Sequence, residues 1–128
     1  MNLAELNNLL NSELTSKIKE SKEENGELLI NVELANIYST ILFLKTDSKC
    51  KFRQLIDILA VDFPGEEDRF KIYYLLLSHE NNIRIKIVSQ IQIDSKVPSI
   101  TKIYPSANWM EREVFDTVSY THLTLPTM

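Results

Sequence analysis

The 128-residue sequence has few of the residues that usually mark a cofactor site, with one cysteine, two glycines and two histidines. A single cysteine, Cys50, excludes an intrachain disulfide and a cysteine-ligated cluster, and we interpret it as a plain thiol in a reducing compartment. Gly26 and Gly65 are too few for a glycine-rich phosphate loop. No spacing matches a zinc or iron site, so we expect no cofactor and no metal on this chain.

Excess positive charge and long hydrophobic runs are also missing. The net charge is −4 and the isoelectric point is about 5.2, without the basic patch of a nucleic-acid-binding protein. No stretch approaches the roughly 20 apolar residues of a membrane span, and the N-terminal residues do not resemble a signal peptide. We therefore expect no nucleic-acid partner and no direct membrane span.

The composition predicts an ordinary folded domain. Hydrophobic residues make up 44% of the sequence and charged residues 25%, which is close to an average globular protein. The length suits one domain, which we place at residues 1–116. We expect residues 117–128, "TVSYTHLTLPTM", to be a non-native or disordered tail.

Hydrophobic spacing predicts two helices and four strands. Leucines and isoleucines three and four residues apart indicate a helix from Leu3 to Lys19, followed by a polar segment that stops at Gly26. A strand is expected over 27–32 and a second helix over 35–45. Three further strands, joined by tight turns, predict an antiparallel meander over 52–63, 69–78 and 83–94.

Two of the meander strands differ in their hydrophobic pattern. Residues 69–78, "RFKIYYLLLS", are apolar on both sides toward their end, which is typical of a central strand covered on both faces. Residues 83–94 alternate, with Ile83, Ile85 and Ile87 on one face. The predicted class is α+β, with a mixed or antiparallel sheet of about four strands and helices packed on one face.

The segment "SANWMEREVFD" concentrates charged residues on one predicted helix. On a helical wheel an apolar arc separates from a polar side, and Arg112 can pair with Asp116 four residues later. Glu111 falls inside the apolar arc, where a carboxylate is costly without donors. It therefore either accepts hydrogen bonds within the fold or meets a basic partner. The arc contains Met110, Val114 and Phe115, and the polar side contains Trp109, Arg112, Glu113 and Asp116.

Acid–base catalysis is the alternative for this helix. Glu111, Glu113 and Asp116 could act together if the fold separated their pKa values, as in a free-standing carboxylate-dependent hydrolase. No nucleophile or base accompanies them, because His79 lies in a polar turn and His122 in the C-terminal tail. An exposed Trp109 beside charged residues favours a protein contact instead.

A longer string of motifs resembles one family. "LIDILAVDFPGEEDRFKIYYLLLS", "NIRIKI" and "VPSITKIYPSANWMEREVFD" occur in order between Leu55 and Asp116. They resemble the C subunit of bacterial NADH-quinone oxidoreductase, the complex I 30-kilodalton subunit family. The most diagnostic piece is the Glu-Arg-Glu of residues 111–113, followed two residues later by Asp116.

The resemblance implies a hydrophilic subunit of the peripheral arm of a proton-translocating NADH:quinone oxidoreductase. Such a subunit has no catalytic residue and binds no cofactor, while NADH, flavin, iron–sulfur clusters and quinone belong to partner subunits. It would pack beside the iron–sulfur and quinone-pocket subunits, on the cytoplasmic side of the bacterial inner membrane. The equivalent subunit of a related membrane-bound hydrogenase or another quinone-reducing complex is the close alternative.

The C-terminal residues depart from the family pattern. After the acid, the family continues with two hydrophobic residues, a glycine and a histidine-containing segment, whereas this sequence continues with "TVSYTHLTLPTM". We expect that this tail is a sequence-assembly or cloning artefact and that the family's C-terminal extension is missing. His122 is therefore not equated with the family histidine, and an isolated chain is expected to be a monomer.

Overall fold

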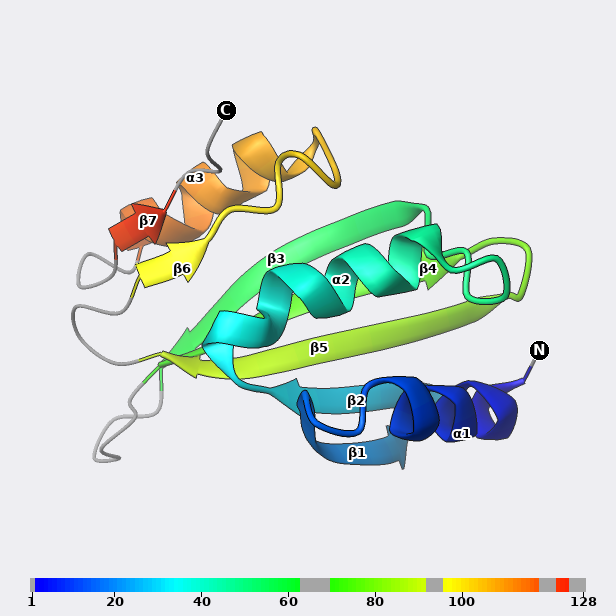
Figure 1. Cartoon of the computed structure of the whole chain (residues 1–128). Coiled ribbons are helices and arrows are strands. Elements are labelled where there is room, and N and C mark those ends of the chain that lie inside the picture. Colours follow the sequence, from blue (N-terminus) through cyan, green and yellow to red (C-terminus); the bar gives the residue numbers. More distant parts are fainter. Residues whose placement is uncertain (1, 63–69, 92–95, 118–121, 125–128) are drawn as a thin grey trace.

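A five-stranded sheet forms the centre of the protein (Figure 1). The computed structural model describes residues 2–62, 70–91, 96–117 and 122–124. The order is β1-β2-β5-β4-β3, with β2 and β5 parallel and the other neighbours antiparallel. The α+β class and the meander are confirmed, with one strand more than expected. The strands are β1 (Ile18–Glu24), β2 (Glu27–Val32), β3 (Gln54–Asp62), β4 (Phe70–Ser78) and β5 (Ile83–Ile91).

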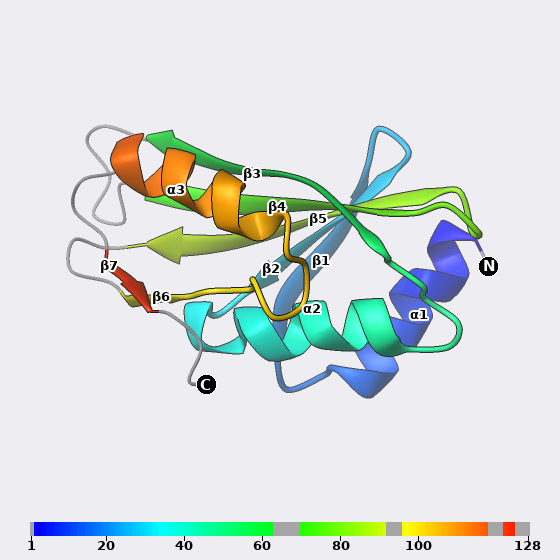
Figure 2. The same cartoon turned by 90° about the horizontal axis from the view of Figure 1, so that it is seen from above.

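Helices cover one side of this sheet. The helices α1 (Leu3–Glu13) and α2 (Ile37–Thr46), the latter preceded by a 3-10 turn η1 (Leu34–Asn36), lie on the same side (Figure 2). The third helix, α3 (Ala107–Thr117), contacts β3 and lies along that edge of the sheet. The helices and the covered side of the sheet share one continuous hydrophobic core.

The first helix ends earlier than predicted, and the polar segment after it is a strand. Asn2 caps α1 by accepting a hydrogen bond from the Glu5 amide at 2.9 Å, and the helix stops at Glu13. Residues 18–24 then pair with β2. Asn25 and Gly26, with φ of 54° and 78°, form the turn between them, as an Asn-Gly hairpin does. The prediction of a helix through Lys19 was wrong because Ile18 also fits a helical spacing.

The covered side of the sheet is closely packed. Inward residues alternate along β4 and β5, and Ile72, Leu76, Ile85 and Ile87 have no exposed surface. From α2, Ile37, Ile41 and Leu44 are equally buried. Burying a side chain of this size contributes about 1.5–3 kcal/mol, so this side supplies most of the stability.

The other side of the sheet carries no described helix (Figure 2). Tyr73, Leu75 and Leu77 of β4 point to this side and are only half-buried. The apolar pattern of β4 predicted cover on both faces, and the described part of the chain covers only one. We name this side the open face.

The C-terminal residues include one short strand. Strand β6 (Lys96–Pro98) pairs in parallel with β7 (His122–Thr124). Residues 118–121 and 125–128 lie outside the described residues, so the expected non-native or disordered tail stays a prediction.

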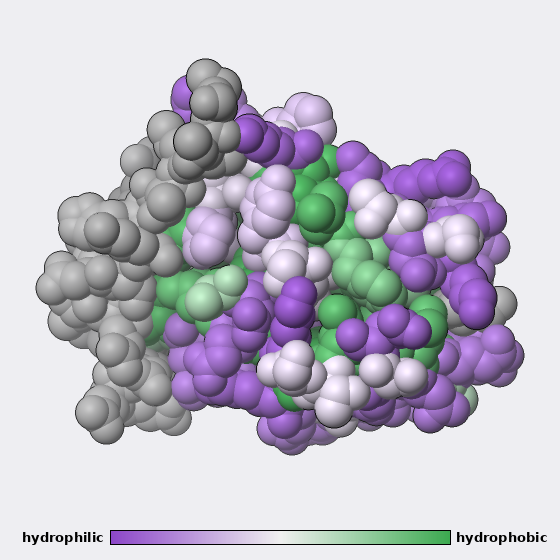
Figure 3. Space-filling view, viewed as in Figure 1, coloured by the Kyte–Doolittle hydropathy of each residue, from purple (hydrophilic) through white to green (hydrophobic). Residues whose placement is uncertain are grey.

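The face that carries α1 and α2 mixes hydrophobic with hydrophilic residues (Figure 3).

Candidate functional site

Helix α3 places its charged residues on different sides. Ala107, Glu111 and Val114, spaced four and three residues apart, are buried against the sheet edge, as helical periodicity requires. Trp109 is 67% exposed and Met110 is half-buried. Arg112 and Glu113 are exposed. The side chain of Asp116 lies outside the described residues, so its pairing with Arg112 stays a prediction.

Glu111 is buried, with 2% of its surface exposed, and it is hydrogen-bonded within the fold. Its Oε1 accepts a hydrogen bond from the Ser99 hydroxyl at 2.7 Å and one from the Ile100 amide at 3.3 Å. Its Oε2 is buried without a hydrogen-bond partner in the described structure. Burial raises the pKa of Glu111 above its ordinary value, against the two hydrogen bonds, which lower it. Glu111 thus joins α3 to the segment that precedes it.

That preceding segment is fixed to the core by further polar contacts. The Tyr104 hydroxyl donates to the Phe52 carbonyl. The Lys45 ammonium donates to the Ile103 carbonyl at 2.5 Å and lies 5.3 Å from the centre of the Tyr104 ring. Residues 99–104 are therefore held to α2 and to the start of β3, which fixes the entry of α3.

The carboxylates of α3 do not converge. Glu111 faces the core, whereas Glu113 lies on the surface beside a shallow hollow of about 210 Å³ lined by Ile58, Leu59, Ala60, Glu113 and Val114. A carboxylate-dependent hydrolase needs two acids at one cleft. Among the described side chains, Glu111 and Glu113 do not provide that arrangement.

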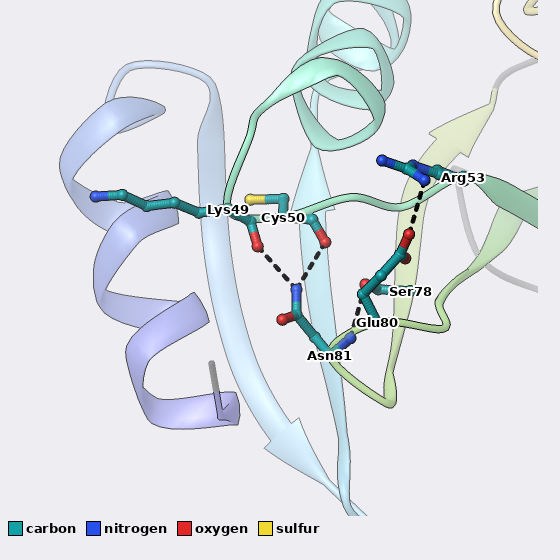
Figure 4. A network of polar contacts seen from close by, with 6 residues as sticks. All are labelled: Lys49, Cys50, Arg53, Ser78, Glu80 and Asn81. Atoms are coloured by element: carbon teal, nitrogen blue, oxygen red, sulfur yellow. Dashed lines mark hydrogen bonds and ion pairs between the residues drawn. The ribbon is translucent and has the colours of Figure 1, made fainter.

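Cys50 lies in a structural tie between two turns (Figure 4). The Asn81 amide donates to the carbonyls of Lys49 and Cys50 at 2.8 and 3.0 Å, and Arg53 pairs with Glu80 at 2.8 Å. Burial, and then the charge of Asp47, raise the pKa of the Cys50 thiol to about 12. A thiol that holds its proton in this way is a poor nucleophile.

His79 and the other candidate ligands form no metal site in the described structure. His79 is exposed in the β4–β5 turn, with its Nε2 2.5 Å from the side-chain oxygen of Gln54. Within the described ranges no three His, Cys, Asp or Glu residues are grouped to hold a metal ion. No described helix is long and apolar enough to cross a membrane.

The open face holds exposed residues that lie within the quoted motifs but were not predicted as part of a site. Leu59 and Val61 of β3 are 44% and 38% exposed, and with Tyr73, Leu75 and Lys86 they line a second hollow of about 210 Å³. Leu59 also lines the hollow beside α3. In the sequence, the apolar residues on both sides of β4 were the only sign that this face would be apolar. Which residues of β3 and β5 lie beside them could be recognised only from the strand register.

Comparison with known proteins identifies the family of the chain. The family described as respiratory-chain NADH dehydrogenase, 30 Kd subunit, matches residues 30–119. The chain belongs to this family. Its N-terminal 29 residues, including α1 and β1, precede the matched region.

Relatives named as the C subunit of NADH-quinone oxidoreductase support the same family. The protein of Mesorhizobium japonicum is 37% identical over 114 residues, covering 89% of this chain and 57% of the relative. That of Ruegeria sp. (strain TM1040) is 50% identical over 91 residues, covering 71% of this chain and 45% of the relative. The chain thus spans about half the length of the curated relatives it matches.

A solved structure shows the same fold. A chain in the structure of the membrane-bound sulfane sulfur reductase, an archaeal respiratory membrane complex, matches with a TM-score of 0.80 and 22% identity. The match covers 94% of this chain and 69% of that chain. At this identity the likeness concerns the fold alone.

Proposed function

We propose that the chain is a non-catalytic structural subunit in the peripheral arm of a proton-translocating NADH:quinone oxidoreductase. The observation that carries the proposal is the family match over residues 30–119, together with relatives named as one subunit of NADH-quinone oxidoreductase. In this role the chain binds no cofactor itself. NADH, flavin, iron–sulfur clusters and quinone are bound by partner subunits, among them the iron–sulfur and quinone-pocket subunits beside it.

Helix α3 supports this role through its two-sided design. Glu111 is buried and bonded to Ser99 and Ile100, so it orients the helix. The orientation leaves Trp109 exposed, and an exposed tryptophan is a common centre of protein interfaces. The Glu-Arg-Glu motif is therefore a structural and contact-forming element rather than a catalytic one.

The proposal also places the protein in the cell. A subunit of this kind lies in the bacterial cytoplasm, against the cytoplasmic side of the inner membrane, and is held there through the complex. The alternative is the equivalent subunit of a related membrane-bound hydrogenase or quinone-reducing complex. The fold likeness to an archaeal respiratory complex is compatible with it, but the relatives named as part of NADH-quinone oxidoreductase favour the first assignment.

The test is affinity purification of the tagged chain from detergent-solubilised membranes of its source organism. A matched version replaces residues 117–128 with a C-terminal extension from a relative of the same family. Quantitative mass spectrometry then measures which proteins copurify. We expect the iron–sulfur and quinone-site subunits of NADH-quinone oxidoreductase with the extended version. Recovery of hydrogenase subunits instead would support the alternative, and recovery of neither set by either version would contradict the proposal.

A further inference from the structure

Helix α3 is held to the protein by little apolar surface and by one buried acid. Its described buried residues are Ala107, Glu111 and Val114, and Met110 is partly buried against the core. An alanine and a valine bury less apolar area than the leucines and isoleucines that anchor α1 and α2. Elements with few buried apolar contacts open locally before the whole protein unfolds. The state of Glu111 therefore has a large influence on whether α3 stays docked.

The chain just before α3 contains a short exposed hinge. Residues 99–104 are fixed to the core, because Tyr104 is buried and its hydroxyl donates to the Phe52 carbonyl. Pro105 and Ser106, which follow directly, are both exposed. A change of backbone angles at these two residues would move α3 as a body and leave residues 99–104 in place.

The carboxyl group of Glu111 bonds across this hinge to the fixed segment. Both donors to its Oε1, the Ser99 hydroxyl and the Ile100 amide, belong to that segment. Its Oε2 has no donor among the described residues. A buried carboxylate is costly unless a cation or further hydrogen bonds offset its charge. The surroundings of Glu111 therefore favour the neutral, protonated carboxyl group.

Titratable groups on the sheet and on α2 do not offset a charge on Glu111. On β4, the Tyr74 hydroxyl is buried, and burial and then the charge of Glu111 raise the pKa of Tyr74 above its ordinary value. On β3, Asp57 is itself an acid. On α2, Lys45 donates to the Ile103 carbonyl. The cations of β4 and β5 lie at outward positions of the sheet, on the open face: Lys71, Arg84 and Lys86.

The segment before α3 and the helix itself also provide no described countercharge to Glu111. Lys102 is exposed, as are Arg112 and Glu113 on the helix. Burial has the largest influence on the pKa of Glu111 and raises it, whereas the two hydrogen bonds lower it. Three further charged or titratable side chains lie outside the described ones: Lys96, Asp116 and His122.

We propose that Glu111 is a proton-controlled switch, which holds α3 docked while its carboxyl group is protonated and releases the helix about residues 105–106 when the proton is lost. On release the carboxylate leaves the protein interior and becomes hydrated, while few apolar contacts are given up. The switch links one proton to the position of the helix surface that carries Trp109. This inference depends on the fold and does not rest on the proposed function.

The direction of the pH dependence follows from the two positions of α3. In the docked position burial raises the pKa of Glu111, whereas in the released position the hydrated carboxyl group has its ordinary pKa of 4.5. The docked position therefore binds the proton more tightly and is most favoured below pH 4.5. The ratio of released to docked helix should grow by about tenfold per pH unit above that value and level off at the docked-state pKa.

Two measurements on the isolated full-length chain test the switch. Carbon-13 NMR of labelled glutamate carboxyl groups, titrated from about pH 4 to about pH 9, gives the pKa of Glu111. Its resonance is the one that is missing in Glu111→Gln. Hydrogen exchange, corrected for the intrinsic pH dependence of the amides, gives the released fraction of α3, and the amides of β4 and β5 report global unfolding in the same samples.

We expect Glu111 to titrate above pH 4.5 and the exchange of α3, relative to that of β4 and β5, to rise by about tenfold per pH unit there. Glu111→Gln has no proton to lose, so its α3 should stay protected throughout. Glu113→Gln makes the same change at an exposed position of the same helix. It is the matched control and should behave as the parent does.

A second variant tests the sign of the effect and carries the test if Glu111→Gln does not fold. Ser99→Ala removes a donor that favours the ionised form of Glu111. We expect it to move the transition upward by about one pH unit. A transition that stays in place or moves downward in this variant would contradict the switch.

Other results would also overturn the inference. A pKa of Glu111 at or below 4.5 would show that the fold stabilises it as an ion. Exchange of α3 that follows the sheet at every pH would show that the helix is not released by itself. A transition that persists in Glu111→Gln would belong to another group, such as Asp116 or His122.

Discussion

The two faces of the sheet are built from the same strands but have opposite relations to solvent. On the face covered by α1 and α2, inward residues such as Ile72 and Ile85 are fully buried. On the open face, Leu59 and Val61 are 44% and 38% exposed. Their neighbours along β3, Ile58 and Ala60, are buried and half-buried. The comparison shows that folding buries one apolar face and leaves apolar side chains of the other partly exposed.

Replacing a residue of the covered face with a charge should have the largest effect. Ile85→Asp places an ionisable group where the native side chain has no exposed surface, and we expect a loss of about 4 kcal/mol or more in unfolding free energy. Arg84→Asp, on the next, outward position, is the control and should change it by less than about 1 kcal/mol. Urea denaturation measures both, and an equal, small change in the two would contradict the assignment of faces.

Truncating adjacent residues of β3 compares the two faces directly. Ile58→Ala opens a cavity at a position that is 3% exposed, so we expect a loss of about 2–4 kcal/mol. Leu59→Ala, on the open face, should cost less than about 1 kcal/mol in the isolated chain. Thermal unfolding of the two variants is the measurement. Equal losses would mean that the open face is packed in the isolated chain.

Removing the tether of α3 should have an intermediate effect. Ser99→Ala takes away the hydroxyl that donates to Glu111 at 2.7 Å, which leaves a buried carboxylate with one donor fewer. We expect a loss of about 1–3 kcal/mol in unfolding free energy. Ser48→Ala, at an exposed serine, is the control, because Thr101 contacts the Ser99 hydroxyl and shares its network. If Ser99→Ala is neutral, the hydrogen bond does not hold the helix.

The smallest effect should be the pH dependence that Glu111 contributes. Because burial raises its pKa in the folded state, the folded protein keeps this proton to a higher pH than the unfolded chain does. Stability from this group is therefore full below its ordinary pKa of 4.5 and falls as the pH rises toward the folded-state pKa. Glu111→Gln cannot ionise, so its unfolding free energy relative to the parent should increase from pH 4.5 to pH 7. A constant difference across that range would contradict the account.

Local patterns in the sequence predicted most of the covered face. Alternation at Ile83, Ile85 and Ile87 gave the buried side of β5, and the helical wheel placed Glu111 among apolar neighbours. Both depend on periodicity along one element, which a single sequence displays. The Asn25–Gly26 dipeptide also predicts a hairpin, but Ile18 was assigned to the preceding helix and β1 was missed.

Contacts between distant segments could not be predicted in the same way. The donors to Glu111 come from Ser99 and Ile100, on a segment whose position depends on Tyr104 and Lys45. The parallel pairing of β2 with β5 joins strands separated by a helix and two other strands. The hollows of the open face depend on this register. The apolar pattern of β4 therefore predicted that this face is apolar, but it could not predict the shape of the surface.

If the chain is a subunit as proposed, the apolar open face should be covered in the complex, and cysteine labelling tests this most directly. Cys50 is buried with a raised pKa, so a maleimide should react mainly with an introduced thiol. Val61→Cys and Leu42→Cys report on opposite sides of the protein from native residues of equal exposure, 38%. Both should be labelled in the isolated chain, and only Val61→Cys should be protected in the purified oxidoreductase that contains it. Equal labelling of Val61→Cys in the free and assembled states would contradict the account.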